Sequence, residues 1–349
     1  MKKALSVIVL LAVFFSCRKQ EEYLPPDFNY KIEPVQITED VEVGAFYSNY
    51  SAADWAKKFT NTPLSGEYSA LDPQIMESHR KWADEGGVNF FIFNWNGASA
   101  GDPLLNSFIG GRNSAVRMVI NYNMSHLKAT NNSPLEGAKL NTMIEEFREL
   151  ADQHFGKDYY YRLDGRPVVM ISPLNLSGSA ASSIDYQAVI PAVKAAMAES
   201  GIDLYIIGEI TQGWLPPVRY ANAIKAMDAV ELSNWATDTY DRAVFFNSFS
   251  DMNWKNWTDS TRKWNVDFVP CILPAYNDKV MNPASKMINL GSEPNFFVDY
   301  CNVAKRNMSE KRLVIVNSWN NFQLGTSVEP TEEYGKKYLE ILRDQFKVK

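Results

Sequence analysis

Short apolar runs alternate with helical patterns along most of this chain. Eight of the runs have the length and composition of strands, and most are almost continuously hydrophobic, as strands covered on both faces are. They are Val41–Tyr47, Asn89–Asn94, Arg117–Tyr122, Pro167–Ser172, Asp203–Ile210, Ala229–Ser233, Asp267–Leu273 and Leu313–Asn317. Between them, apolar residues recur at spacings of three and four, which predicts amphipathic helices.

The helical segments carry start and stop signals. Asp72-Pro73 supplies an N-cap followed by proline, and Gly86-Gly87 ends that helix. Similar patterns predict the helices Ala138–His154, Asp185–Ser200, Pro216–Met227, Asp251–Trp264, Ser292–Asn307 and Thr331–Phe346. Eight strands that alternate with helices over about 300 residues predict an α/β fold, a single (β/α)8 TIM barrel. The alternative is an open doubly wound sheet, but its G-x-G-x-x-G phosphate turn is not in the sequence.

The first residues form a targeting segment rather than part of the fold. Lys2 and Lys3 precede the apolar stretch Ala4–Phe15, which is too short to span a bilayer, and Ser16-Cys17 follows. A small residue before cysteine is typical of bacterial lipoprotein signals. Residues 1–16 are therefore predicted to be a signal peptide, with Cys17 as the lipidated N-terminus. The alternative is a plain secretory peptide with an incidental cysteine.

The segment after Cys17 is charged, rich in proline and without periodicity. Residues 17–40 are therefore predicted to be a tether, and residues 41–349 the barrel domain. This organisation predicts a protein of the cell envelope that is held to the outer membrane by a lipid anchor. The sequence leaves open whether it faces the cell surface or the periplasm.

The amino-acid composition favours some classes of binding partner over others. The net charge is −6 and no basic patch is visible, which argues against a nucleic-acid partner. The aromatic share is 13%, and Trp and Tyr rings are faces that sugar-binding clefts use, although cores use them too. Cys271 and Cys301 lie in apolar runs and are interpreted as buried small side chains. The three histidines lack ligand spacing, so neither a metal nor a cofactor is predicted.

In a barrel, the residues just past the strands share one mouth. At six of the eight predicted strand ends, asparagine stands close to tryptophan or tyrosine, and an amide both donates to and accepts from sugar hydroxyls. We therefore predict a carbohydrate-binding mouth, although for any one residue taken alone packing is the simpler interpretation. The predicted substrate-binding residues are Tyr47, Asn94, Trp95, Tyr122, Asn123, Trp235, Tyr276, Asp278, Trp319, Asn320, Asn321 and Gln323.

Glycoside hydrolysis usually needs two carboxyl groups that face each other across a sugar. Glu209 ends a long apolar strand and Glu231 lies within the next, where an acid carries a desolvation cost unless it is partnered. These two residues are the candidate catalytic pair, with a structural ion-pair role as the alternative for Glu231. Glu329 precedes a predicted helix and is interpreted as a fold-stabilising acceptor or a helix N-terminal charge.

Three segments carry a family pattern: Gly66–Trp95, Phe268–Val280 and Ser318–Pro330. They resemble glycoside hydrolase family 99, the endo-α-mannosidases, and related family 99-like barrel proteins of Bacteroidetes polysaccharide loci. The resemblance implies a barrel whose mouth faces α-mannan-type or related glycans. It also implies that Asn321 and Leu324 stand where the family has its two catalytic glutamates. Neither side chain exchanges protons usefully, so the family's chemistry does not follow from the resemblance.

Three functions are therefore left open. The first is a glycan-binding lipoprotein with a hydrolase-like barrel that has lost the family's chemistry. The second is an active endo-acting glycoside hydrolase that uses Glu209 and Glu231. The third is a non-enzymatic component that works with other outer-membrane glycan-uptake proteins.

Overall fold

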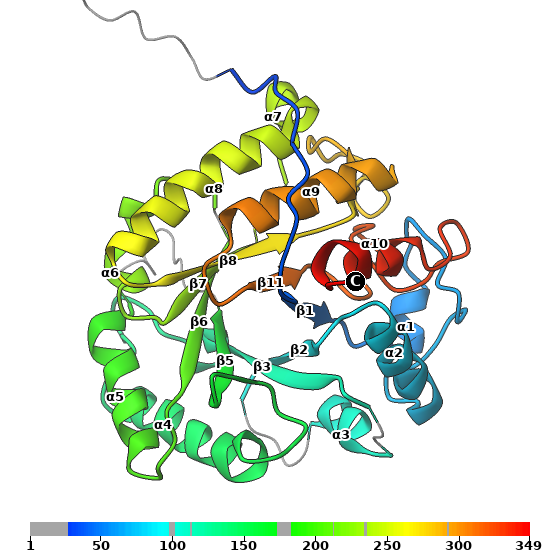
Figure 1. The fold of residues 1–349 in the computed structure, drawn as a ribbon. Coiled ribbons are helices and arrows are strands. Elements are labelled where there is room, and N and C mark those ends of the chain that lie inside the picture. The colour runs from blue at the N-terminus through cyan, green and yellow to red at the C-terminus, as the bar shows by residue number, and fades with distance from the viewer. Residues whose placement is uncertain are drawn as a thin grey trace, which may run out of the picture.

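A closed barrel of eight parallel strands forms the centre of the molecule. In a computed structural model of the chain, the described residues are 27–97, 102–111, 114–172, 183–211, 213–233, 236–291 and 293–349. The strand order is β1-β2-β3-β5-β6-β7-β8-β11, and β11 pairs with β1 to close the barrel (Figure 1). The barrel strands are β1 (Glu42–Tyr47), β2 (Phe90–Trp95), β3 (Arg117–Asn123), β5 (Arg166–Ser172), β6 (Tyr205–Ile210), β7 (Ala229–Leu232), β8 (Asp267–Ile272) and β11 (Leu313–Val316). The predicted (β/α)8 TIM barrel is confirmed, with all eight predicted strands.

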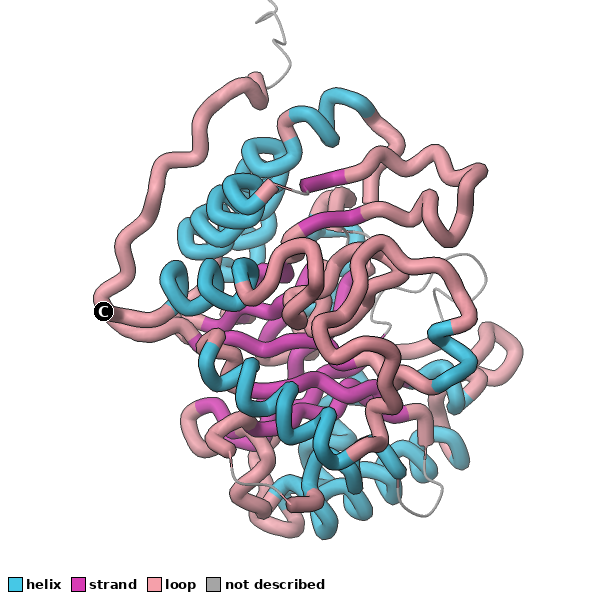
Figure 2. The backbone as a smooth tube through the Cα atoms, turned by 90° about the vertical axis from the view of Figure 1, so that its right-hand side faces the viewer, coloured by secondary structure: helices cyan, strands magenta, loops and turns pink. Residues whose placement is uncertain are grey.

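Helices follow the strands and cover the outside of the barrel, while the strands run side by side within (Figure 2). The helices are α1 (Ala52–Trp55), α2 (Pro73–Glu85), α3 (Pro103–Ile109), α4 (Ala138–Leu150), α5 (Tyr186–Ala198), α6 (Ala221–Ile224), α7 (Tyr240–Val244), α8 (Phe246–Lys263), α9 (Pro294–Asn307) and α10 (Lys337–Phe346). Short 3-10 turns lie at Met124–Leu127 (η1) and Pro217–Tyr220 (η4), and a π turn at Ala151–Phe155 (η2) extends α4. Three short strands complete the fold: β4 (Arg162–Leu163), β9 (Ala275–Tyr276) and β10 (Leu290–Gly291).

Two predicted helix boundaries are wrong. The helix predicted from Thr331 begins only at Lys337, because Thr331 forms isolated bridges with Pro63 and Gly335. Gly335 has a φ of 55°, a left-handed conformation that interrupts the helical pattern. The helix predicted from Asp251 instead begins at Phe246.

Residues 27–40 pack on the barrel, although the sequence predicts a tether there. Tyr30 donates its hydroxyl to the carbonyl of Ser248 and to Asp251, both on α8. Further along, the backbone N–H of Val35 donates to Asn302 on α9. Ile32 lies between these contacts and is only 4% exposed. The segment therefore crosses α8 and α9 on its way to β1 (Figure 1).

The predicted signal peptide and Cys17 lie outside the described residues. Within the part of the chain that the structure describes, no helix has both the length and the apolar character needed to span a bilayer. Cys271 and Cys301 are both free and buried, as predicted.

Side chains from alternate strand positions fill the barrel interior. The cluster includes Phe90, Ile92, Val119, Val168, Met170, Ile207, Ala229, Val269 and Ile315. Gly44 on β1 faces this cluster, and a Cβ there would lie 2.2 Å from the ring of Phe90. Glycine at this position therefore makes room for Phe90, whose ring stacks on Tyr161 at 4.1 Å between centroids. The lower part of the described barrel interior is thus filled by side chains.

Candidate functional site

The asparagine–aromatic pairs at the strand ends divide between two environments. Side chains on a strand alternate in direction. Ile92 and Val119 point into the barrel, so Asn94 and Asn121, two residues further along the same strands, point inward as well. Trp95 and Tyr122 point the other way, into the layer between sheet and helices, where their rings stack 5.3 Å apart. The amides therefore face the mouth and the aromatic rings do not.

Four predicted substrate-binding rings belong to this helix-facing layer. The exposed fractions of Tyr47, Trp95, Tyr122 and Trp319 are 3%, 7%, 0% and 0%. The Tyr47 hydroxyl lies 2.8 Å from Nδ1 of His79 on α2, and Tyr122 donates to Glu146 on α4. In place of the predicted sugar contacts, these rings make core contacts. Tyr47, Trp95 and Tyr122 do so because their strand positions have the outward parity, and Trp319 does so from the loop after β11.

A ring of polar side chains forms the upper course of the barrel interior; we call it the mouth floor. It consists of Asn94, Asn121, Ser172, Glu209 and Ser233. Asn121 donates to Asn94 at 2.9 Å, and the Ser233 hydroxyl donates to Glu209 at 3.0 Å. Directly below, the interior is apolar. The mouth floor thus offers amide, hydroxyl and carboxyl groups toward the upper opening of the barrel.

Glu209 is the accessible acid of the mouth floor. Its side chain is half-buried, whereas the other inward acid at this level, Glu231, is fully buried. Burial raises the pKa of Glu209, and hydrogen bonds from Ser233, Ser172 and Asn121 partly offset that rise. A raised pKa lies closer to neutral pH, where a carboxyl can exchange a proton with a ligand.

Glu231 is the register partner of Glu209 on the neighbouring strand. Both side chains have the inward parity, so the sequence-predicted pair is brought together on one face of the sheet. Desolvation raises the pKa of Glu231 well above its ordinary range, and the nearby charge of Glu209 raises it further. The Cys271 thiol on β8 lies beside it, and burial likewise raises the pKa of that thiol.

The loop after β11 is fastened by Asn320, which is fully buried. Its Oδ1 accepts from the backbone N–H of Ser48 at 2.7 Å, and its Nδ2 donates at 3.0 Å to the Ser48 carbonyl and to the Tyr68 hydroxyl. Asn320 therefore ties the end of β11 to the end of β1. This structural role replaces the predicted contact with a ligand.

Glu329 forms a second buried connection from the same loop. It accepts the Tyr68 hydroxyl at 2.8 Å, and its Oε1 lies 3.2 Å from Nε2 of His79, outside hydrogen-bond geometry. The prediction that Glu329 stabilises the fold is confirmed. Together with Tyr47, these groups join β1, α2 and the β11 loop.

Asn321, Gln323 and Leu324 are half-buried on the β11 loop. The Asn321 side chain accepts from the backbone N–H of Leu324 at 3.2 Å, which stabilises the turn. The N–H of Asn277 in the loop after β8 donates to the Leu324 carbonyl at 2.8 Å. The two loops are therefore joined at the rim.

Other predicted residues hold the rim loops together. Asp278 accepts from Ser285 within the loop after β8, and Asn123 caps η1 by accepting from the N–H of Ser125. Tyr276 is 7% exposed, and burial followed by the charge of Asp278 raises its pKa to about 12. Trp235 lies outside the described residues. No group of three or more His, Cys, Asp or Glu side chains that could hold a metal occurs among the residues the structure describes.

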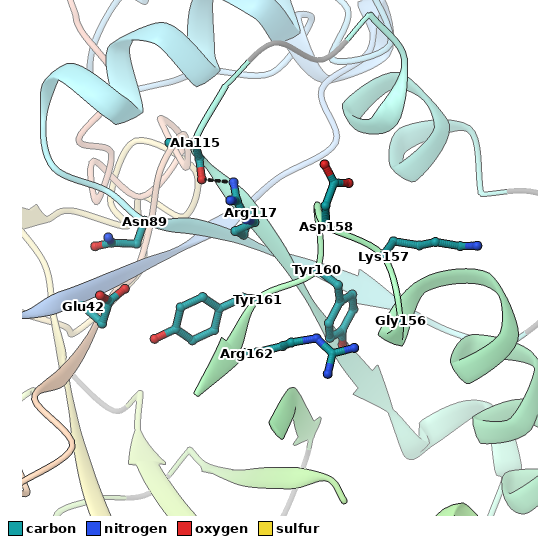
Figure 3. Close-up of a pocket in the computed structure, with 10 residues that line it drawn as sticks. All are labelled: Glu42, Asn89, Ala115, Arg117, Gly156, Lys157, Asp158, Tyr160, Tyr161 and Arg162. Atoms are coloured by element: carbon teal, nitrogen blue, oxygen red, sulfur yellow. Dashed lines mark hydrogen bonds between the residues drawn. The ribbon is translucent and has the colours of Figure 1, made fainter. Parts of the chain in front are cut away.

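Two cavities open at the opposite, amino-terminal end of the strands. One, of about 540 Å³, is lined in part by Glu42, Arg117 and Arg162 (Figure 3). Arg117 donates to the Ala115 carbonyl, and Arg162 to those of Gly165 and Phe155. A larger cavity, of about 1100 Å³, has its central cations Arg166 and Lys194 paired with Asp228. These hydrogen bonds and ion pairs connect the amino-terminal ends of the strands, which favours a stabilising role for this end of the barrel.

Asn121, Ser172, Ser233 and Cys271 were not among the predicted site residues. All four have inward parity near the carboxyl ends of their strands. Counting every second residue from the apolar interior positions would have found them, whereas proximity to an aromatic residue did not.

The family model described as "Glycosyltransferase WbsX" matches residues 138–342, more than half of the chain. The chain belongs to the WbsX glycosyltransferase family. No curated protein matches it. Among solved structures, a "Glycoside hydrolase-like protein" is 29% identical, with a TM-score of 0.82, over 92% of this chain and 98% of that one.

The family 99 endo-alpha-mannosidase from Bacteriodes thetaiotaomicron, solved with BIS-TRIS-Propane, has a similar fold. It is 20% identical, with a TM-score of 0.64, over 88% of this chain and 97% of that one. A putative alpha-L-fucosidase from Bacteroides thetaiotaomicron has a TM-score of 0.51 at 11% identity, over 91% of this chain and 100% of that one. This WbsX-family chain thus has a glycoside hydrolase-like TIM barrel related in fold to family 99.

Proposed function

We propose that this WbsX-family protein binds glycans at the carboxyl-terminal mouth of its barrel. The observation that carries the proposal is the mouth floor, where amide, hydroxyl and carboxyl groups from five strands face one opening. Sugar hydroxyls both donate and accept hydrogen bonds, so such a surface suits them. The likeness to an endo-alpha-mannosidase makes α-mannan-type glycans the first ligands to test.

A second candidate function is cleavage of the bound glycan. The pairing of Glu209 with Glu231 favours it, because two neighbouring carboxyls with unequal burial can take different proton states. The sequence of the β11 loop argues against cleavage. By the resemblance to family 99, Asn321 and Leu324 stand at the positions where that family has its catalytic glutamates. Binding without the family's reaction is therefore the primary proposal, and Glu209 would be the acid that touches the sugar in the second.

The proposal includes a lipid anchor on Cys17 and a place in the cell envelope. Its support is the sequence alone: a basic start, an apolar stretch and a small residue before cysteine. In this setting the protein would work beside other outer-membrane proteins that take up glycans. Mass spectrometry of the membrane-extracted protein would detect the lipid, and a Cys17→Ala variant would release the protein from the membrane.

Affinity electrophoresis in α-mannan and release of reducing ends test the two functions separately. Retention without release supports binding alone. Retention with release that is lost in Glu209→Gln supports cleavage. Glu310→Gln is the matched control, because Glu310 is exposed between α9 and β11 at the far end of the barrel. Absence of both retention and release across neutral, acidic and amino-sugar glycans would refute the glycan proposal.

A further inference from the structure

Glu231 is a buried acid that accepts from no oxygen or nitrogen donor among the described residues. Its side chain is fully buried in the barrel, and neither carboxyl oxygen has a hydrogen-bond partner within the described residues. An ionised carboxylate in that position would have lost its hydration without compensation, which costs several kcal/mol even after the protein relaxes. A neutral carboxylic acid carries a far smaller cost.

The groups around Glu231 do not supply a positive charge. Glu209 lies beside it on β6, Cys271 on β8, and Tyr300 on α9 is the remaining titratable neighbour. In the described barrel interior, the cations Arg117 and Arg166 are at the amino-terminal starts of β3 and β5.

Glu209 is the acid next to Glu231 on the neighbouring strand, and it is the better placed of the two to carry a charge. The two residues are opposite each other in register, both inward, on strands that lie about 4.8 Å apart in a sheet. The Ser233 hydroxyl donates to Glu209, and donors of this kind stabilise its ionised form. Glu231 has beside it the thiol of Cys271, which is a weak donor and lowers its pKa less than burial raises it. Of the two neighbouring carboxyls, the fully buried Glu231 therefore keeps the proton and the half-buried Glu209 carries the charge.

We infer that Glu231 is a neutral carboxylic acid in the resting protein, and that the neighbouring Glu209 carries the negative charge of the pair. Glu231 is then a positioning residue: it orients Glu209 and fixes the number of protons that the mouth floor holds. The raised pKa of Glu231 agrees with this assignment. The inference rests on the proposed function only in placing Glu209 against a sugar.

Infrared spectroscopy tests the inference without any ligand. The carbonyl stretch of a protonated carboxyl is separate from the bands of a carboxylate. In the wild-type protein at pH 7, where ordinary Glu side chains are ionised, we expect a protonated-carboxyl band. Glu231→Gln should abolish the band, whereas Glu209→Gln should keep it and shift its frequency, because the charged neighbour is gone. Cys271→Ala should leave the band in place.

Thermal unfolding against pH gives a second readout. A group whose pKa is raised by folding adds stability below its unfolded pKa, and that stability is lost as pH rises through the folded pKa. The melting temperature of Glu231→Gln should therefore rise relative to wild type as pH increases. A wild-type protein with no protonated-carboxyl band at pH 7, or a Gln variant whose advantage shrinks with rising pH, would overturn the inference. Failure to bind glycan would leave both readouts unaffected.

Discussion

Replacing Asn320 by alanine should destabilise the barrel strongly although the residue lies on a loop. Three hydrogen bonds are lost, to the N–H and carbonyl of Ser48 and to the Tyr68 hydroxyl. Each buried backbone group left without a partner costs about 1–3 kcal/mol. Because Ser48 is only partly buried, water satisfies some of this loss, and we expect a total of roughly 3 kcal/mol.

The expected change in melting temperature follows from the size of the domain. Unfolding entropy is about 2.1 cal/mol/K per residue, or roughly 0.6 kcal/mol/K for a barrel of about 300 residues. A loss of 3 kcal/mol therefore lowers the melting temperature by about 5 °C. Differential scanning calorimetry at one fixed pH and scan rate measures this shift.

The adjacent residue provides a matched control. Asn321 is half-buried and its side chain accepts one hydrogen bond, from the Leu324 N–H. Asn321→Ala should cost no more than about 1 kcal/mol, a shift of 1–2 °C. Equal shifts for the two variants would refute the argument, because they would show that the bonds between the β11 loop and the end of β1 contribute no more than an exposed turn.

Three further predictions concern other parts of the molecule. Tyr47→Phe should lower stability by about 1 kcal/mol through loss of the hydrogen bond to His79, and should leave α-mannan retention at the wild-type level. Weaker retention would show that the Tyr47 hydroxyl contacts the ligand. Ile32→Ala should cost about 2–4 kcal/mol in chemical denaturation, and no change would mean that residues 27–40 are a free tether after all. Burial alone would raise the pKa of Asp228, but bonds from Lys194, the Ile206 N–H and Arg166 outweigh it and leave the pKa below its ordinary value. The stability that ionised Asp228 contributes is present above its unfolded pKa near 4 and is lost as pH falls through its folded pKa. Asp228→Asn should therefore cost about 2 kcal/mol at pH 7. In acid unfolding experiments, the difference in stability between this variant and wild type should shrink as pH falls.

The barrel could be predicted from the sequence because its signals are local. Each buried strand is a short apolar run, and caps such as Asp72, which accepts from the Gln74 N–H, act within a few residues. The boundary of α10 could not be predicted, since the bridge between Thr331 and Pro63 joins segments far apart in the chain. The packed segment around Ile32 was missed for the same reason, because its contacts on α8 and α9 are distant in sequence.

The candidate site was only half determined by the sequence. It identified Glu209 and Glu231 as strand-end acids and Asn94 as a mouth residue, since residue type and strand position suffice for that. Only the tertiary structure decided which way each neighbour points. It placed Trp95 in the helix-facing core, made Asn320 a structural connection and set Glu231 beside Glu209 in the barrel interior. Side-chain direction depends on register and on what covers each face, and those are properties of the closed barrel rather than of any one strand.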